Sequence, residues 1–161
     1  MRLLAIDPGP EQSAALTYDT DKAQPIAWMK CANDVVRNLI TSADDVDHLA
    51  IEGLASYGMP VGAEVFETAY WIGGFIERWL FGRPYSPRPR LIYRKDVKLH
   101  ICGNTRAKDA NVRQALIDRY GPGKERAVGL KKSPGPLYGL TSDCWSALAV
   151  AITAAETEAT P

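Results

Sequence analysis

The feature that most constrains the fold is a short, uninterrupted apolar run that ends in an acid and a tight turn. Leu3-Leu4-Ala5-Ile6 is followed at once by Asp7-Pro8-Gly9-Pro10. An apolar run of this length is typical of a strand covered on both faces, and the Pro-Gly sequence ends it. Ligands of open α/β sheets bind at strand ends, so Asp7 is a candidate functional residue. An ordinary Asp-Pro-Gly turn is the alternative interpretation.

The same pattern returns in the middle of the chain. Leu49-Ala50-Ile51 leads directly into Glu52, and Gly53 follows. A carboxylate this close to a core strand is unfavourable unless it is paired, bound to a metal or able to reach solvent. Glu52 is therefore a second candidate functional residue, with a solvent-exposed strand end as the alternative.

The remaining periodicities predict an α/β chain. Polar and Gly/Pro-rich turns separate short strands, and apolar residues at three- and four-residue spacing mark helices. Strands are expected at 3–6, 13–18, 25–29, 48–53 and 90–93, and helices from Asn33, over 64–80, 96–102, 107–120 and 142–156. Asn33 is expected to cap the first helix, and 121–140 to be a long loop. The 161 residues fit a single domain, 1–161, built on a mixed sheet.

The charged residues are divided unevenly along the chain. The formal net charge is zero, yet residues 78–132 contain 15 Lys and Arg against 4 Asp and Glu. An asymmetry of this kind indicates an anionic partner for one part of a protein, although a scattered, solvated charge population is the simpler alternative. The rest of the chain is correspondingly acidic, and a metal site is one explanation for its acidic residues.

The cysteines and the hydropathy pattern indicate in which cellular compartment the chain is expected. Cys31, Cys102 and Cys144 form no CxxC pair, so neither a disulfide framework nor a zinc site is indicated. No apolar run approaches the ~20 residues of a membrane span, and the first residues are too short an apolar stretch for a secretory signal. We expect a cytoplasmic protein without a membrane partner.

A third acid, Asp143, is expected in the first turn of the last helix, with Ser146 on the same helical face. Three carboxylates from distant segments are consistent with a Mg²⁺ site, and two such ions ~4 Å apart can activate water and stabilise the leaving oxygen of a phosphodiester. A plain helix-terminal acid is the alternative for Asp143. The basic segment supplies candidate phosphate-binding cations: Lys98, Arg106, Lys108, Arg113, Lys131 and Lys132.

Four segments together resemble the RuvC-type Holliday-junction resolvases, bacterial and phage endonucleases of the ribonuclease H-like fold. They occur in the family order over nearly the whole chain: Leu4–Gly9, Leu49–Glu52, Asp96-Val97-Lys98 with Gly103, Ala107 and Lys108, and Asp143 leading into Ser146–Ala151. The segments 57–62 and 134–139 indicate a divergent, phage-derived branch. The resemblance implies an α/β, ribonuclease H-like domain with a five-stranded mixed sheet and helices on both faces.

The resemblance also implies a function. Members form homodimers that bind four-way DNA junctions and nick two opposing strands with Mg²⁺ or Mn²⁺, one or two ions per active site, and no organic cofactor. Asp7, Glu52 and Asp143 match family acids and are the expected metal ligands. Ser146 stands where the family has a second helix acid, so Ser146 itself, water or a DNA phosphate is expected to complete the binding of a second metal. Lys98 and Lys108 match lysines that face the DNA backbone. Tyr57 lies where the family carries a junction-stacking aromatic residue.

Other functions remain open at this point. One is a ribonuclease H-like hydrolase acting on RNA–DNA hybrids or damaged DNA, and another is a catalytically impaired junction-binding protein, which Ser146 suggests. A sugar-kinase or actin-like ATPase module is disfavoured, because it needs two such halves and a second Gly-rich loop. If the chain dimerises, we expect the helix over 64–80 to be central, since it carries Phe66, Tyr70, Trp71, Phe75 and Trp79.

Overall fold

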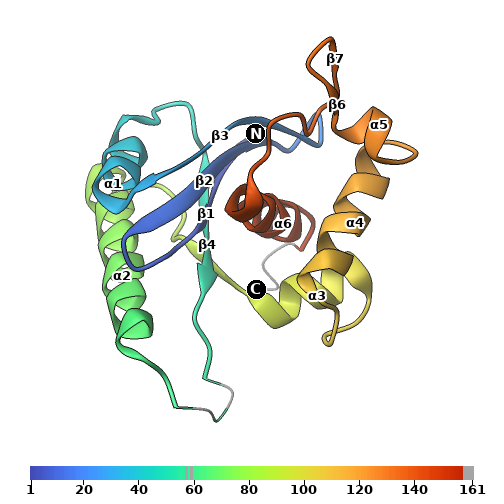
Figure 1. Ribbon diagram of the computed structural model, residues 1–161. Coiled ribbons are helices and arrows are strands. Elements are labelled where there is room, and N and C mark those ends of the chain that lie inside the picture. Colours follow the sequence, from blue (N-terminus) through green and yellow to red (C-terminus); the bar gives the residue numbers. More distant parts are fainter. Residues whose placement is uncertain (57, 59, 158–161) are drawn as a thin grey trace.

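The computed structural model of the chain describes residues 1–56, 58 and 60–157 (Figure 1). The elements of the main body, in chain order, are β1 (Arg2–Asp7), β2 (Gln12–Asp19), β3 (Gln24–Ala32), α1 (Asn33–Ser42), β4 (His48–Gly53), α2 (Ala63–Gly82), β5 (Arg90–Tyr93), α3 (Arg94–Cys102), α4 (Asp109–Tyr120) and α6 (Ser142–Glu156). The predicted α/β architecture is confirmed, and each expected strand and helix of the main body is present.

The sheet is five-stranded and mixed, in the order β3-β2-β1-β4-β5. β1 lies at its centre, antiparallel to β2 and parallel to β4, and β4 is parallel to β5. The continuous apolar run of β1 is explained by this position, because Leu3, Leu4, Ala5 and Ile6 are all buried between helices on both sides.

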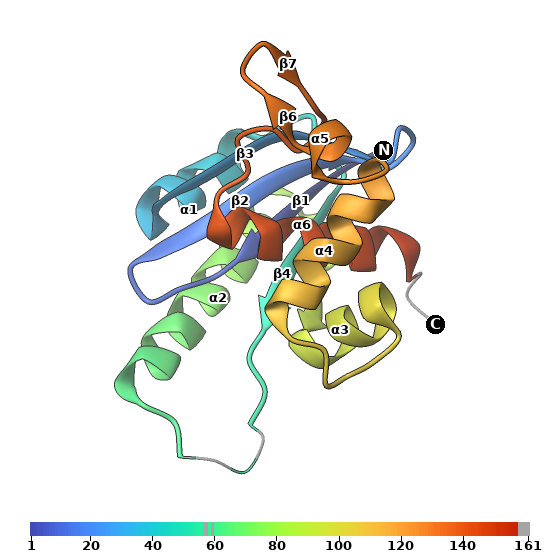
Figure 2. The same ribbon diagram turned by 45° about the vertical axis from the view of Figure 1, so that its right-hand side comes forward.

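Helices cover both faces of the sheet, as expected. α1 and α2 pack on one face, and α3, α4 and α6 on the other (Figures 1 and 2). Side chains alternate along a strand, so Leu4 and Ile6 join the core with Phe75 and Trp79 of α2. Leu3 and Ala5 join the opposite core with α6. α6 is alanine-rich and almost wholly buried, which allows it to lie close against β1 and β2.

Two sequence expectations need correction. The 121–140 segment is not a bare loop, because it contains the short helix α5 (Lys124–Ala127) and a hairpin of β6 (Gly129–Leu130) and β7 (Ser133–Pro134). Asn33 is not the cap of α1 but its first residue, and Ala32 occupies the cap position without a side-chain hydrogen bond. The Asn33 side chain is buried and engaged elsewhere, in contacts described below.

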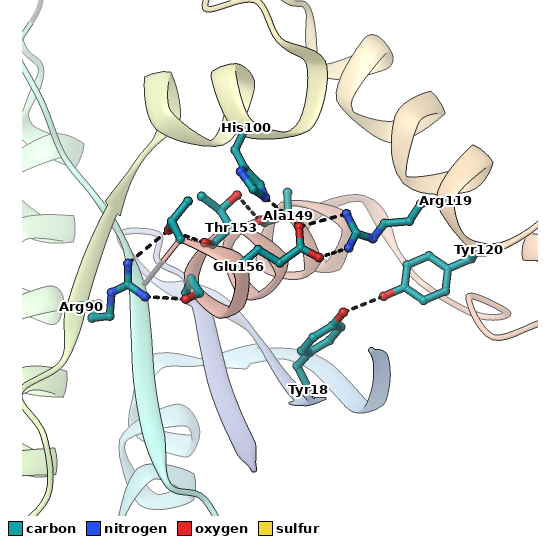
Figure 3. Close-up of polar contacts among 10 residues, drawn as sticks. Tyr18, Arg90, His100, Arg119, Tyr120, Ala149, Thr153 and Glu156 are labelled. Atoms are coloured by element: carbon teal, nitrogen blue, oxygen red, sulfur yellow. Dashed lines mark hydrogen bonds and ion pairs between the residues drawn. The ribbon is translucent and has the colours of Figure 1, made fainter. Parts of the chain in front are cut away.

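The C-terminal end of α6 is held by a cluster of polar contacts (Figure 3). Glu156 accepts hydrogen bonds from both terminal nitrogens of Arg119 on α4, and its Oε2 lies 2.8 Å from Nε2 of His100 on α3. Arg90 of β5 donates to the backbone oxygen of Ala154 and to Thr157 Oγ1. These bonds tie α3, α4 and β5 to the last turn of α6.

Within the described part of the chain, no helix combines the length and apolar character needed to cross a bilayer.

Candidate active site at the strand ends

Strand alternation brings the first two candidate acids to the same face of the sheet. Ala5 and Ala50 lie opposite one another in the β1–β4 ladder and both belong to the core under α6. Two residues further along each strand are Asp7 and Glu52, so both side chains project toward α6 at the ends of neighbouring parallel strands. The convergence of these acids follows from strand register rather than from any local motif.

The turn after Asp7 is fixed by a buried hydrogen-bond network. Asn33 Nδ2 donates to the backbone oxygen of Gly9 at 2.9 Å, and Ser13 Oγ donates to Asn33 Oδ1 at 2.6 Å. Ser13 Oγ in turn accepts a bond from the Gly9 amide at 3.3 Å. A Cβ atom at Gly9 would lie 2.5 Å from the backbone oxygen of Gln12, so this turn requires glycine. The network sets the direction in which the chain leaves Asp7.

The third acid, Asp143, lies in the first turn of α6 and forms an ion pair across the sheet edge. Its Oδ2 is 2.5 Å from Nζ of Lys30, which lies on β3. The carboxylate also lies at the positive end of the α6 dipole, which is a favourable place for a negative charge. Lys30 was not among the candidates from sequence, because only the pairing of β3 with β2 brings it here.

A second unpredicted cation, Arg94, contacts the site from the first turn of α3. Its Nη1 donates to Glu52 Oε1 at 3.2 Å and its Nη2 lies 2.6 Å from Asp109 Oδ2, at the start of α4. Lys98 Nζ lies 3.8 Å from Asp109 Oδ1. The sequence did hold a signal for Arg94, because this residue directly follows the fifth predicted strand, just as Asp7 ends the first. It was not selected because the search at strand ends was for acidic side chains.

The acids and several of these cations line one cavity of about 520 Å³. It is bounded by the ends of β1 and β4, by α3 and α4, and by the first turns of α6. Its charged and polar lining residues are Asp7, Glu52, Arg94, Lys98, Asp109, Arg113, Asp143 and Ser146. Trp145 forms an apolar wall, and the Arg113 guanidinium lies over its ring, 4.9 Å from the centroid. The three predicted acids, Ser146 and two predicted cations are therefore brought together.

The pKa of Asp7 is raised to about 8, first by burial and then by the neighbouring Glu52 carboxyl. Arg94 opposes this rise and Asp143 adds a smaller increase. The cause is the apposition of two acids in a space with little water, where both cannot be ionised without a compensating cation. Asp7 thus holds a proton at neutral pH in the metal-free protein, in a place where a cation would stabilise both charges.

The donor set fits a hard divalent cation. Mg²⁺ takes oxygen ligands and is commonly bound through one or two carboxylates, with waters and substrate phosphates completing the shell. Asp7 and Glu52 supply two such carboxylates at one point. Among the described residues, no group of three or more His, Cys, Asp or Glu side chains is placed to hold a metal ion. Asp143, the third predicted ligand, lines the same cavity and is paired with Lys30.

The other predicted DNA contacts lie outside this cavity. Arg106 and Lys108 are exposed in the turn between α3 and α4, next to Asp109 at the start of α4. Lys131 and Lys132 are exposed at the turn of the β6–β7 hairpin, beyond the opposite end of α4 (Figure 2). Tyr57, the candidate stacking residue, lies outside the described residues.

No protein-family model matches the chain, and no curated protein matches it at significant similarity. Solved structures do. The chain is similar to the Thermus thermophilus RuvC structure, with a TM-score of 0.69, 17% identity, and 95% of this chain and 92% of that chain covered. It is also similar to T. thermophilus RuvC in complex with Holliday junction substrate, with a TM-score of 0.64, 18% identity and the same coverage. The chain therefore has the RuvC fold, which is ribonuclease H-like.

Proposed function

We propose that this protein is a metal-dependent, structure-selective endonuclease that nicks four-way DNA junctions by phosphodiester hydrolysis. The observation that carries the proposal is the single cavity in which carboxylates from β1, β4 and α6 meet Lys98 and Arg113, on the fold of a junction resolvase. A nuclease needs both parts, acids to hold a metal and cations to hold phosphate. A sequence origin in a phage-derived branch is part of the same proposal.

In this proposal Asp7 and Glu52 are the principal metal ligands, and Asp143 lies beside them as the third acid of the site. Mg²⁺ or Mn²⁺, when bound, would supply Lewis-acid stabilisation of the phosphoryl oxygens and lower the pKa of a bound water. The protein's own residues orient the substrate. Lys98 and Arg113 contact phosphate at the cavity, and Asp109 holds Lys98 and Arg94 in place before DNA binds.

The wider DNA path follows the basic residues around α4. Arg106 and Lys108 extend the cavity's positive charge at the start of α4, and Lys131 and Lys132 offer a second contact region at the hairpin. Two regions separated by the length of a 12-residue helix, ~18 Å, suit two arms of a branched substrate better than one short duplex segment. Tyr57 is proposed to stack on an exposed base.

A homodimer is proposed because two opposing nicks require two related active sites, which a twofold axis supplies. α2 carries the proposed interface. Phe75 and Trp79, which sequence analysis counted toward it, are buried in the core and excluded. Phe66, Tyr70 and Phe81 are 58%, 81% and 77% exposed and provide apolar area for a partner. A monomeric mass at micromolar concentration by light scattering would reject the dimer.

The function is tested by incubating the purified protein with a synthetic four-way junction in Mg²⁺, with EDTA as the negative control. Linear duplex and RNA–DNA hybrid substrates run in parallel. We expect paired nicks in the junction only, and none in EDTA. Cleavage of the hybrid would favour a different ribonuclease H-like activity, and tight junction binding without nicking would identify a binding protein.

A further inference from the structure

The acids around the cavity are already largely neutralised by the protein's own cations. Arg94 contacts both Glu52 and Asp109, and Lys98 also approaches Asp109. Lys30 contacts Asp143 at 2.5 Å. Asp7 differs, because the Glu52 carboxyl lies against it and the charge of Arg94 offsets only part of that repulsion. The negative charge that still calls for an external cation is therefore concentrated at Asp7 and Glu52.

The position of Lys30 is set by the sheet and not by a flexible surface chain. Ala14 of β2 is paired with Asp7 on one side and with Lys30 of β3 on the other. Asp7, Ala14 and Lys30 thus form one row across three strands, and residues in such a row project from the same face. The small Ala14 side chain lies between the acid and the lysine. Asp143 meets Lys30 from the first turn of α6, above this row.

We propose that Lys30 is a charge-compensating residue of the active site that takes the place of a second metal ion, so that each chain binds one divalent cation, at Asp7 and Glu52. This inference rests on the nuclease function proposed above and specifies its metal requirement. It also assigns a role to an edge-strand lysine that neither the sequence motifs nor the comparisons single out.

The number and charge of the available metal ligands explain why one ion is expected and not two. Two divalent cations ~4 Å apart repel one another and need several shared carboxylates to be held together. Here Asp143 is engaged by an ammonium group, and Ser146, one turn further along α6, offers only a neutral hydroxyl to the same cavity. One Mg²⁺ with two carboxylates, waters and a phosphate is a common arrangement that these residues satisfy.

The test counts metal ions on the DNA-free protein with Mn²⁺ as the probe, by electron paramagnetic resonance and titration calorimetry. We expect one Mn²⁺ per chain for the wild type, and its loss in Asp7→Asn. Lys30→Met removes the ammonium group that contacts Asp143, so a second Mn²⁺ should bind and the first should bind about five- to tenfold more tightly. Lys30→Arg keeps the charge and should behave as the wild type. Lys22→Met is the matched control, a β2–β3 turn lysine that is 70% exposed.

Two results would overturn the inference. One is two Mn²⁺ ions of comparable affinity on the wild-type chain, a measurement that depends on no variant folding correctly. The other is a Lys30→Met chain whose Mn²⁺ count and affinity equal those of the wild type and of Lys22→Met. A wild-type chain that binds no Mn²⁺ at millimolar concentration would instead reject the metal-dependent function itself, so the two failures are distinguished.

Discussion

Asp143 and Glu156 lie at opposite ends of α6 and are almost equally exposed, at 39% and 35% of the side chain. Their surroundings differ. Glu156 is one carboxylate facing two basic side chains, Arg119 and His100, and among the described residues no second acid forms an ion pair with them (Figure 3). Asp143 shares its cavity with three more acids, and burial together with the neighbouring Glu52 carboxyl raises the pKa of one of them, Asp7.

The comparison shows that exposure does not distinguish a structural acid from a functional one in this chain. Among the described residues, the difference is whether a carboxyl lies against another carboxyl, as Asp7 lies against Glu52, or against basic side chains, as Glu156 does. At the C-terminal end of α6, basic side chains from α3 and α4 meet the carboxylate of Glu156 and so connect three helices. At the N-terminal end, like charges are forced together, which is unfavourable for folding and favourable for binding a cation. Substitutions at the two ends of α6 should therefore have different effects on cleavage and on stability.

The largest effect on cleavage is expected from Asp7→Asn, which removes a proposed metal ligand from the cavity at the N-terminal end of α6. Junction cleavage in Mg²⁺ should fall by roughly 10³-fold or more. Junction binding should persist or improve, because a negative charge near phosphate is lost. Nicking assays and fluorescence anisotropy measure the two quantities. Asp34→Asn, an exposed acid in the first turn of α1, is the control and should cleave normally. A parallel loss of binding would contradict a metal-ligand role.

The second prediction concerns pH and stability in EDTA. The pKa of Asp7 is raised from 3.8 to about 8, so between these values the folded chain holds a proton that the unfolded chain has released. The free energy of unfolding should therefore fall as pH rises from about 4 to about 8, by about 1.4 kcal/mol per pH unit, and then level off. Urea titrations across this range measure the slope.

Two additions sharpen the same experiment. Asp7→Asn should remove most of the slope and be more stable than the wild type at pH 8, because the amide cannot ionise. Millimolar Mg²⁺ should also raise wild-type stability at pH 8, since it binds the folded carboxylates. A wild-type stability that rises between pH 5 and 8 in EDTA would contradict the assignment of this proton to Asp7.

The third prediction compares basic residues at the cavity and at the start of α4 with those at the hairpin. Lys98→Ala and Lys108→Ala should each reduce the slope of log affinity against log salt by about one unit. Cleavage should fall further for Lys98→Ala, because this side chain lines the cavity. Lys132→Ala should reduce the salt slope with little loss of cleavage at saturating junction. An unchanged slope in the Lys98/Lys108 double variant would show that this segment does not follow the DNA backbone.

The smallest effect on cleavage is expected at the C-terminal end of α6. Glu156→Gln should lower the free energy of unfolding by about 0.5–1 kcal/mol, because the pair is partly exposed to solvent, and leave cleavage unchanged. Glu77→Gln on α2 removes an ion pair with Arg37 of α1, in which the nitrogen and oxygen are 3.8 Å apart. It should change the free energy of unfolding less than Glu156→Gln does. Thermal and urea unfolding provide the values. A loss of cleavage in Glu156→Gln would mean that the two ends of α6 are coupled.

Sequence reasoning located the parts of the site that depend on local pattern. Asp7 and Glu52 end apolar strands, and Asp143 begins an apolar helix, so each could be identified within its own segment. Lys30 and Arg94 could not, because their roles depend on which strands are neighbours and in which register. Asn33 was recognised as special but misassigned. The cap preference was visible in sequence, whereas its buried bonds to Ser13 and Gly9 are long-range.

The parallel register of β1 and β4 has a consequence for the length changes that the chain can absorb during evolution. Residues added to the connections around the sheet leave Asp7 and Glu52 facing α6. A single residue inserted before Glu52 within β4 would turn that carboxylate to the α2 face, among Ile72 and Phe75. Insertions and deletions among descendants of this chain should therefore accumulate in the connecting segments and be absent from 2–7 and 48–53.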